Sequence, residues 1–164
     1  LKTVVIPAFN LDGVIRHQRG NGRGVDLNRN MATNDWTGEF TNPRYNPGPS
    51  ANSEPETRVL VDLLAQLKPA FILSLHSWHP VLNVNGDCVR EATAMAQWNG
   101  YDIKDSIGYP TPGCLGTYCG LERDMPVLTY EIERGLKSQL ILKTHLQAIE
   151  EGLKVTEATR RKSI

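Results

Sequence analysis

The stretch Ala70-Phe71-Ile72-Leu73-Ser74-Leu75 runs directly into His76-Ser77-Trp78-His79-Pro80. It is almost continuously apolar, a pattern typical of a strand that is covered on both faces of a sheet. Ligands gather at the carboxyl ends of strands in such sheets, so the histidine that follows is a candidate functional residue. The stretch therefore predicts both a buried strand and the position of a site.

The segments around this strand predict an alternation of strands and helices. The preceding helix is expected to begin at a capping box, with Ser53 as N-cap and Glu56 three residues later, and to end before Pro69. The other expected elements are a strand at Thr3 to Ile6, a helix at Arg90 to Asn99 closed by Gly100, a strand at Val127 to Ile132, and a final amphipathic helix marked by Leu142, Leu146, Ile149 and Leu153. This alternation predicts an α/β layered domain with a mostly parallel sheet.

Two long segments lack the periodicity of helices or strands. Met31 to Asn52 contains Pro43, Pro47 and Pro49, and a structureless segment of this length inside a compact domain is usually functional or disordered. Tyr109 to Gly120 is expected to be a loop because it is rich in proline and glycine.

Composition excludes several classes of protein. The 164 residues are 40% hydrophobic and 22% charged, which fits one globular domain. Eighteen basic and eighteen acidic residues give a formal net charge of +0, so neither a nucleic acid nor an anionic membrane surface is an expected partner. No apolar run approaches the roughly 20 residues of a membrane-spanning helix. A small or peptide-like partner is expected, and the sequence leaves the oligomeric state open.

The three cysteines, Cys88, Cys114 and Cys119, form no C-x-x-C pair. An odd number argues against a closed disulfide framework and favours a reducing compartment. Cys114 and Cys119 have no second pair that would complete a tetrahedral metal site, so no metal is expected there.

Two polar side chains lie at the carboxyl ends of predicted strands, His76 and Glu131. Either residue alone is more often a hydrogen-bonded structural group, but together they suggest a metal ligand and a general base. His79 would face the opposite side of an extended strand from His76, so at most one of the two is expected to be a ligand. His17 and His145 have no metal-binding context.

A second candidate set lies in the polar segment Gly24 to Asn30, where Asn28 stands beside Arg29. An amide next to a guanidinium can grip a carboxylate through paired hydrogen bonds, although a solvated turn could look similar. The glycines from Gly20 to Gly24 do not form a nucleotide-binding loop, because no strand precedes them directly and the G-x-G-x-x-G spacing fails.

The chain resembles the zinc carboxypeptidase family, and within it the branch of murein peptide amidases. Four blocks in chain order carry the resemblance: Asn10 to Gly13, Arg19 to Asn30, Ser53 to Glu56 with Ser74 to Ser77, and Thr129 to Glu131. The stretch Gly108 to Cys119 is similar to the amidase branch in particular. The resemblance implies a layered α/β/α fold with a mixed, mostly parallel sheet.

The resemblance also implies the chemistry of particular residues. It implies the following roles: His76 as a zinc ligand, Glu131 as the general base, Arg19 as the stabiliser of the developing oxyanion, Asn28 and Arg29 as the clamp on the substrate carboxylate, Leu115 and Gly116 as the lining of the substrate pocket, and Tyr109 as the mobile tyrosine over the substrate. Tyr118 is a competing candidate for that last role.

One part of the family pattern is absent from the sequence. The family holds zinc with two histidines and a glutamate, and the first two of these ligands come from a His-x-x-Glu segment, which occurs nowhere in this chain. We therefore expect residues 1–164 to be the C-terminal portion of a single catalytic domain in a longer polypeptide. That polypeptide would bind one zinc, with two of its ligands upstream of Leu1. The alternative is a metal-free descendant that binds peptidoglycan peptides.

The expected activity is hydrolysis of the peptide bond between γ-D-glutamate and diaminopimelate in murein peptides. An ordinary metallocarboxypeptidase and a metal-free peptide-binding module are the two alternatives. A cytoplasmic location is expected from the recycling relatives, and a periplasmic one is the alternative.

Overall fold

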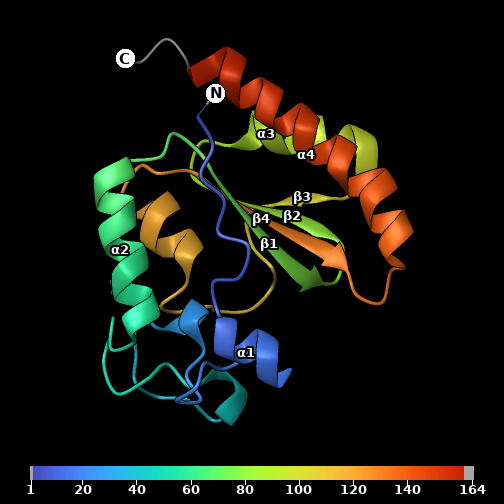
Figure 1. Cartoon of the computed structure of the whole chain (residues 1–164). Helices are drawn as coiled ribbons and strands as arrows, with labels where there is room; N and C mark the ends of the chain where they lie inside the picture. Colours follow the sequence, from blue (N-terminus) through green and yellow to red (C-terminus); the bar gives the residue numbers. More distant parts are fainter. Residues whose placement is uncertain (1, 161–164) are drawn as a thin grey trace. The chain divides into compact units, whose positions relative to one another are not determined.

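The computed structural model describes residues 2–160, which fall into two compact units (Figure 1). The first unit is built from the chain up to Lys68 together with Pro110–Tyr118. The second is built from Pro69–Tyr109 together with the chain from Cys119 onwards. Each unit is described separately below.

Helices and turns make up the first unit, and the sheet lies in the second. The first unit contains α1 (Leu11–Arg16), short 3-10 helices at Leu27–Arg29 and Pro43–Tyr45, and α2 (Pro55–Leu67). The second contains β1 (Ile72–Trp78), β2 (Val81–Asn85), α3 (Val89–Asn99), β3 (Ile103–Lys104), β4 (Val127–Glu133) and α4 (Ser138–Arg160). A π-helical stretch at Gly116–Leu121 spans the boundary in sequence between the two units. The predicted α/β class is confirmed.

The sheet has four strands in the order β1-β4-β2-β3. Strand β4 pairs with β1 in parallel and with β2 in antiparallel, and β2 pairs with β3 in parallel. The sheet is therefore mixed. Because β1 and β4 run in the same direction, their carboxyl ends meet at the same edge of the sheet, where Arg134 donates its backbone N–H to the carbonyl of Trp78 at 3.0 Å.

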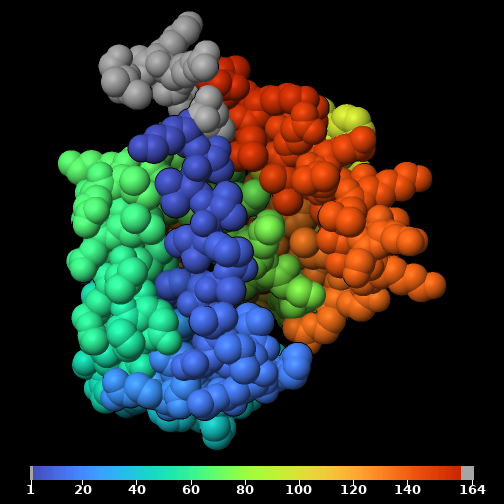
Figure 2. All heavy atoms as spheres, in the orientation of Figure 1, coloured from blue at the N-terminus to red at the C-terminus, as the bar shows by residue number. Residues whose placement is uncertain are grey.

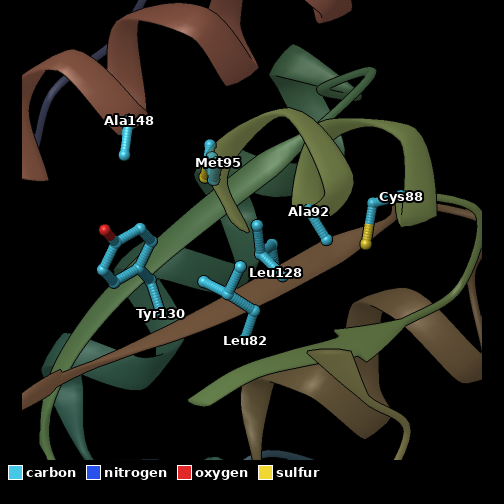
Figure 3. Packing of buried hydrophobic residues seen from close by; sticks show 7 residues of the cluster. All are labelled: Leu82, Cys88, Ala92, Met95, Leu128, Tyr130 and Ala148. Atoms are coloured by element: carbon cyan, nitrogen blue, oxygen red, sulfur yellow. The ribbon is translucent and has the colours of Figure 1, made fainter. Parts of the chain in front are cut away.

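The hydrophobic core of the second unit lies between the sheet and the helices α3 and α4 (Figure 3). Strands β2 and β4 contribute Leu82, Leu128 and Tyr130, which point toward Met95 of α3. These side chains are 0% exposed. Gly152 packs directly against the side chain of Met95, where a side chain on the glycine would clash, and this contact lets α3 and α4 approach closely.

Helix α4 forms as predicted, but only part of its predicted apolar face is buried: Ile149 packs against the core, and Leu153 is half-buried. Leu142 and Leu146 are 62% and 59% exposed, whereas the buried positions are His145, Ala148 and Thr156, together with Gly152. On that face, Gly152 allows the close contact with Met95 of α3, which a larger side chain would prevent. The apolar periodicity identified the helix and only part of the side that packs.

Two strand predictions need correction. Lys2–Ile6 does not form a strand, and the N-terminal segment, dark blue in Figure 2, lies on the surface. Val5 is 75% exposed. Within the described residues, no backbone hydrogen bond ties this segment to a neighbouring strand, and a strand requires such a partner. Strand β1 forms as predicted but is not covered on both faces, because Leu75 is 55% exposed.

The helix boundaries are close to those predicted, but the capping box is wrong. The N-cap of α2 is Glu54 and not Ser53, and Pro55 occupies the first turn. The hydroxyl of Ser53 instead donates to Glu54 Oε1 at 2.8 Å and accepts from Asn30 Nδ2 at 2.9 Å. Ser53, which the local pattern predicts as the N-cap, therefore takes part in a long-range polar network instead. Helix α3 ends at Gly100 as predicted.

The loop predictions hold in part. Residues 31–52 contain only the short 3-10 helix at Pro43–Tyr45, as their lack of periodicity predicts. The predicted loop at Tyr109 to Gly120 is wrong at its end, because Gly116–Leu121 is π-helical.

In the described part of the chain, no helix is long and apolar enough to cross a membrane. The three cysteines are free thiols, and all are buried.

His145 of α4 is a core histidine in a cluster of polar and aromatic groups. Its Nδ1 lies 2.7 Å from the hydroxyl of Tyr130, which also accepts a hydrogen bond from Asn99 Nδ2 at 2.6 Å. Its Nε2 lies 3.5 Å from the hydroxyl of Tyr101. Burial lowers the pKa of His145, and burial raises the pKa of Tyr130 to about 12.

Acidification is therefore expected to destabilise the fold through His145. The unfolded chain takes up the proton at the ordinary pKa of about 6.5, so stability present above that value is lost as the pH falls through the lower pKa of the folded state. The groups that face the ring are Tyr130 from β4 and Tyr101, which follows α3. None of these is a carboxylate that would favour the charged imidazole.

Thermal unfolding between about pH 7 and pH 5 measures this effect. His145→Asn is expected to reduce the loss of stability on acidification, and to lower stability at neutral pH by about 1–3 kcal/mol because a buried hydroxyl loses its partner. His79→Asn replaces an exposed histidine and serves as the control. An unchanged pH dependence in His145→Asn would contradict the prediction.

Candidate active site

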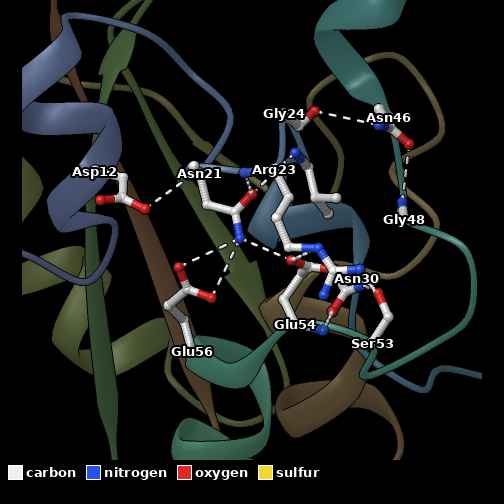
Figure 4. Close-up of polar contacts among 12 residues, drawn as sticks. Asp12, Asn21, Arg23, Gly24, Asn30, Asn46, Gly48, Ser53, Glu54 and Glu56 are labelled. Atoms are coloured by element: carbon white, nitrogen blue, oxygen red, sulfur yellow. Dashed lines mark hydrogen bonds and ion pairs between the residues drawn. The ribbon is translucent and has the colours of Figure 1, made fainter.

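In the first unit, a buried asparagine fixes the segment from Arg19 to Asn30, which carries the candidate residues Arg19, Asn28 and Arg29. The Nδ2 of Asn21 donates to Glu54 Oε2 at 2.8 Å, and its Oδ1 accepts the backbone N–H groups of Arg23 and Val25 (Figure 4). Asn21 and Glu54 are 2% and 0% exposed. The segment is therefore held against the start of α2 by hydrogen bonds that no local sequence pattern reveals.

Asp26 links the predicted site residues of this segment, and the sequence analysis missed it. Its Oδ2 accepts from Arg19 Nε at 2.7 Å, and its Oδ1 accepts the backbone N–H of Asn28 at 3.1 Å. Its carbonyl accepts the backbone N–H of Arg29 at 2.9 Å. The only sequence signal was its place in the same short polar segment. Three of the predicted site residues therefore share one buried aspartate.

Arg29 is a buried cation without an acidic partner in residues 2–160. Its side chain is 6% exposed, and its Nη1 donates to the carbonyl of Asn28 at 2.6 Å. No carboxylate of the described residues lies within ion-pair distance of its guanidinium. A buried charge is expensive unless it is paired, so this guanidinium is suited to receive an anionic ligand.

The side chain of Asn28 has a defined orientation. Its Oδ1 accepts the backbone N–H of Leu115 at 2.9 Å, so its NH₂ group is the end that can donate to a ligand. Gly113 lies directly against the carbonyl of Arg29 with a φ of 73°, a position that only glycine fits easily. Leu115 therefore lies next to Asn28 of the predicted clamp, and the role of Leu115 and Gly116 as pocket lining stays a prediction.

Tyr45 is a second residue that the sequence analysis missed. The guanidinium carbon of Arg19 lies 5.2 Å from the centroid of its ring, and that of Arg29 lies 5.5 Å away. Both distances are within the range of cation–π attraction. Tyr45 lies in the long aperiodic segment, where nothing in the sequence indicated an interaction with residues this distant.

In the second unit, the sheet brings His76 and Glu131 together. They are direct partners in the parallel register of β1 and β4, so their side chains leave the sheet on the same face. Glu131 is 7% exposed, and His76 is half-buried with Nε2 3.0 Å from the hydroxyl of Ser74. The parallel register thus places the two candidate residues side by side, and their roles as metal ligand and general base stay predictions.

The two tyrosines proposed to cover a substrate have different environments. Tyr109 is 42% exposed, and its ring packs edge-on against Trp78 at a centroid distance of 5.6 Å. Tyr118 is 7% exposed. Tyr109 is therefore the more exposed of the two rings, and its one aromatic contact in the described residues is with Trp78.

The described residues do not complete a metal site by themselves. Within residues 2–160, no group of three or more His, Cys, Asp or Glu side chains could hold a metal ion. His76 supplies one imidazole next to Glu131, whereas a zinc site in an enzyme needs about three protein ligands.

Residues 1–113 match the family described as zinc carboxypeptidase. The chain belongs to the zinc carboxypeptidase family. His76, Arg19, Asn28 and Arg29 lie within the matched range, and Glu131 follows it.

Two curated relatives are named murein peptide amidase A. The one from Vibrio campbellii is 31% identical over 163 residues, which cover 90% of this chain and 63% of the relative. The one from Escherichia coli K12 is 32% identical over 127 residues, which cover 70% of this chain and 52% of the relative. The chain thus spans between about half and two thirds of the length of these relatives.

Solved structures agree with this assignment. The murein-tripeptide amidase of Escherichia coli O157 matches with a TM-score of 0.76 at 28% identity, covering 86% of this chain and 63% of that one. Carboxypeptidase A of Helicoverpa armigera also has a TM-score of 0.76, at 22% identity, covering 96% of this chain and 51% of that one. The second similarity shows the shared fold.

Proposed function

We propose that this chain carries the substrate clamp and the general base of a zinc-dependent amidase that hydrolyses murein peptides beside a free carboxylate. The observation that carries the proposal is the guanidinium of Arg29, which is 6% exposed and has no acidic partner in the described chain. Family membership and the names of the two amidase relatives support the same reaction class.

The clamp would act through Arg29 and Asn28. A guanidinium can donate two parallel hydrogen bonds to a carboxylate, and the oriented NH₂ of Asn28 can add a third. These contacts fix the end of the substrate before any bond is broken. They lower the entropic barrier to reaction by holding the scissile bond in one orientation.

Glu131 would move the proton. It would accept a proton from the attacking water and return it to the leaving amine, so that the products are an acid and an amine. Arg19 would stabilise the negative charge that develops on the carbonyl oxygen. Bound zinc would supply a more acidic water and a polarised carbonyl. We propose that His76 is one of its ligands and that the other two come from residues preceding Leu1.

We propose the bond between γ-D-glutamate and diaminopimelate as the one that is cut. The support is the murein specificity stated in the names of the amidase relatives, together with the sequence similarity of Gly108 to Cys119 to that branch. A murein tripeptide ends in the free carboxylate that the clamp requires.

The test compares a murein tripeptide ending in diaminopimelate with the same peptide whose terminal carboxylate is amidated. The free acid is expected to be cut with a kcat/KM about 10–100 times that of the amide, because the amide cannot accept paired charge-assisted hydrogen bonds. Arg29→Lys keeps the charge but not the planar fork, and is expected to lose a similar factor on the acid and little on the amide.

The outcomes separate the alternatives. Equal rates on the acid and the amide would contradict the clamp. A preference for peptides ending in phenylalanine or arginine would indicate an ordinary carboxypeptidase. Tight binding of the tripeptide without any cleavage, in a polypeptide that includes the preceding segment, would indicate a metal-free binding module.

A further inference from the structure

Tyr45 contacts both arginines of the candidate site through its ring. Arg19 and Arg29 lie 5.2 Å and 5.5 Å from the ring centroid, measured from their guanidinium carbons. Two like charges near one point repel each other, and the negative face of an aromatic ring offsets that repulsion while leaving the N–H donors free. A carboxylate in the same place would neutralise the charge that the ligand needs.

The ring matters most for Arg29. Arg19 already has Asp26, whose Oδ2 lies 2.7 Å from its Nε. Among polar and ring partners in residues 2–160, the guanidinium of Arg29 has the carbonyl of Asn28 and the ring of Tyr45. Since Arg29 is 6% exposed, water does little to stabilise or hold it. Within the described residues, the ring of Tyr45 is thus the side chain with a polar or ring contact to this guanidinium.

The backbone around Tyr45 is tied to the segment that carries the arginines. Tyr45 ends a 3-10 helix that Asn42 caps through its side chain. The carbonyl of the next residue, Asn46, accepts the backbone N–H of Asp26 at 2.8 Å, and the Nδ2 of Asn46 donates to the carbonyl of Gly24 at 3.2 Å. The ring is therefore presented from a turn whose position relative to Asp26 is fixed by hydrogen bonds.

We propose that Tyr45 is a positioning residue that holds Arg29 and Arg19 for the carboxylate end and the reacting carbonyl of the substrate. The inference rests on the proposed function of the two arginines. The face of the Tyr45 ring holds the two guanidinium groups. The Tyr45 hydroxyl takes no part, because it makes no hydrogen bond within residues 2–160. Tyr45 thereby sets how strongly the enzyme prefers a free carboxylate.

The experiment uses the complete zinc-bearing polypeptide and a series of rings at position 45. Tyr45→Phe keeps the ring face and is expected to change kcat/KM on the tripeptide acid by less than about twofold. Tyr45→Leu removes the face, and is expected to raise KM about fivefold to thirtyfold with a smaller fall in kcat. Phe40→Leu, at an exposed aromatic residue of the same long segment, is the matched control and should leave both constants unchanged.

Phenylalanine analogues with one, two and three ring fluorines at position 45 make the test independent of folding. They keep the shape of the ring while weakening its negative face step by step, so the affinity for a carboxylate should fall with each fluorine. The probes are N-acetylglycine and N-acetylglycinamide, titrated by NMR. These binding measurements do not require turnover.

The two proposals fail in different ways. If the wild type binds N-acetylglycine no better than the amide, the clamp itself is wrong. If the wild type prefers the acid and keeps that preference through the fluorinated series and in Tyr45→Leu, the role of Tyr45 is overturned while the clamp stands. A loss of folding in Tyr45→Leu alone leaves the fluorinated series to decide.

Discussion

Glu131→Gln is expected to lower kcat by about 10²–10⁴-fold in the zinc-bearing polypeptide while KM changes little. Glutamine has the size and shape of glutamate but cannot accept the proton of the attacking water. Glu131 is 7% exposed, so bulk water is poorly placed to replace it as the base. Its backbone lies in the middle of β4, so the substitution should leave the strand pairing unchanged.

Glu133→Gln is the matched control for this prediction. Glu133 lies two residues further along β4, is exposed, and loses the same charge on the same strand. Its activity should stay within about twofold of the wild type, as surface substitutions usually do. Zinc content is measured by elemental analysis for both variants and should stay at the wild-type level.

Two results would contradict the assignment. If Glu131→Gln keeps most of its activity, Glu131 is not the general base. If the variant loses zinc, Glu131 is a ligand, and the division of roles between His76 and Glu131 is wrong.

The predicted elements that form are those whose signal is local and whose partner is close in sequence. Helix α3 and strand β4 follow from periodicity and from Gly100. Thr3 to Ile6 has an equally good strand composition, yet it forms no strand, because a strand depends on a hydrogen-bonded neighbour that composition does not reveal. Helix α4 shows the same limit, since its close contact with α3 is made at Gly152 while Leu142 and Leu146 stay exposed.

Of the candidate site residues, His76 and Glu131 could be predicted because they lie on strands. His76 was expected to follow a strand and Glu131 to lie near the end of one; both lie inside strands, β1 and β4, and they are partners in the parallel register. Asp26 and Tyr45 could not be predicted in the same way. Their contacts with Arg19 join residues 7 or more positions apart through irregular backbone, for which no periodic signal exists.

The second large effect is expected at Arg19. Its Nε donates to Asp26 at 2.7 Å, which fixes the plane of the guanidinium, and its two terminal nitrogens make no hydrogen bond within residues 2–160. These terminal N–H groups are therefore available to stabilise charge on the carbonyl oxygen. A lysine at position 19 could pair with Asp26 or contact the substrate through its ammonium group. Its compact charge could not make the two contacts at once in the geometry of the guanidinium.

Arg19→Lys is accordingly expected to lower kcat by about 10²–10³-fold, the loss typical of removing one oxyanion donor. Because lysine can still pair with the buried carboxylate of Asp26, the thermal unfolding temperature should change little, and Arg16→Lys at the exposed end of α1 provides the control. The loss should be the same on the tripeptide acid and on its amide, since Arg19 acts on the carbonyl and not on the terminal carboxylate. Arg29→Lys should differ in that respect, because its loss is expected on the acid alone. A rise in KM at constant kcat, or a loss confined to the acid, would instead make Arg19 a second part of the clamp.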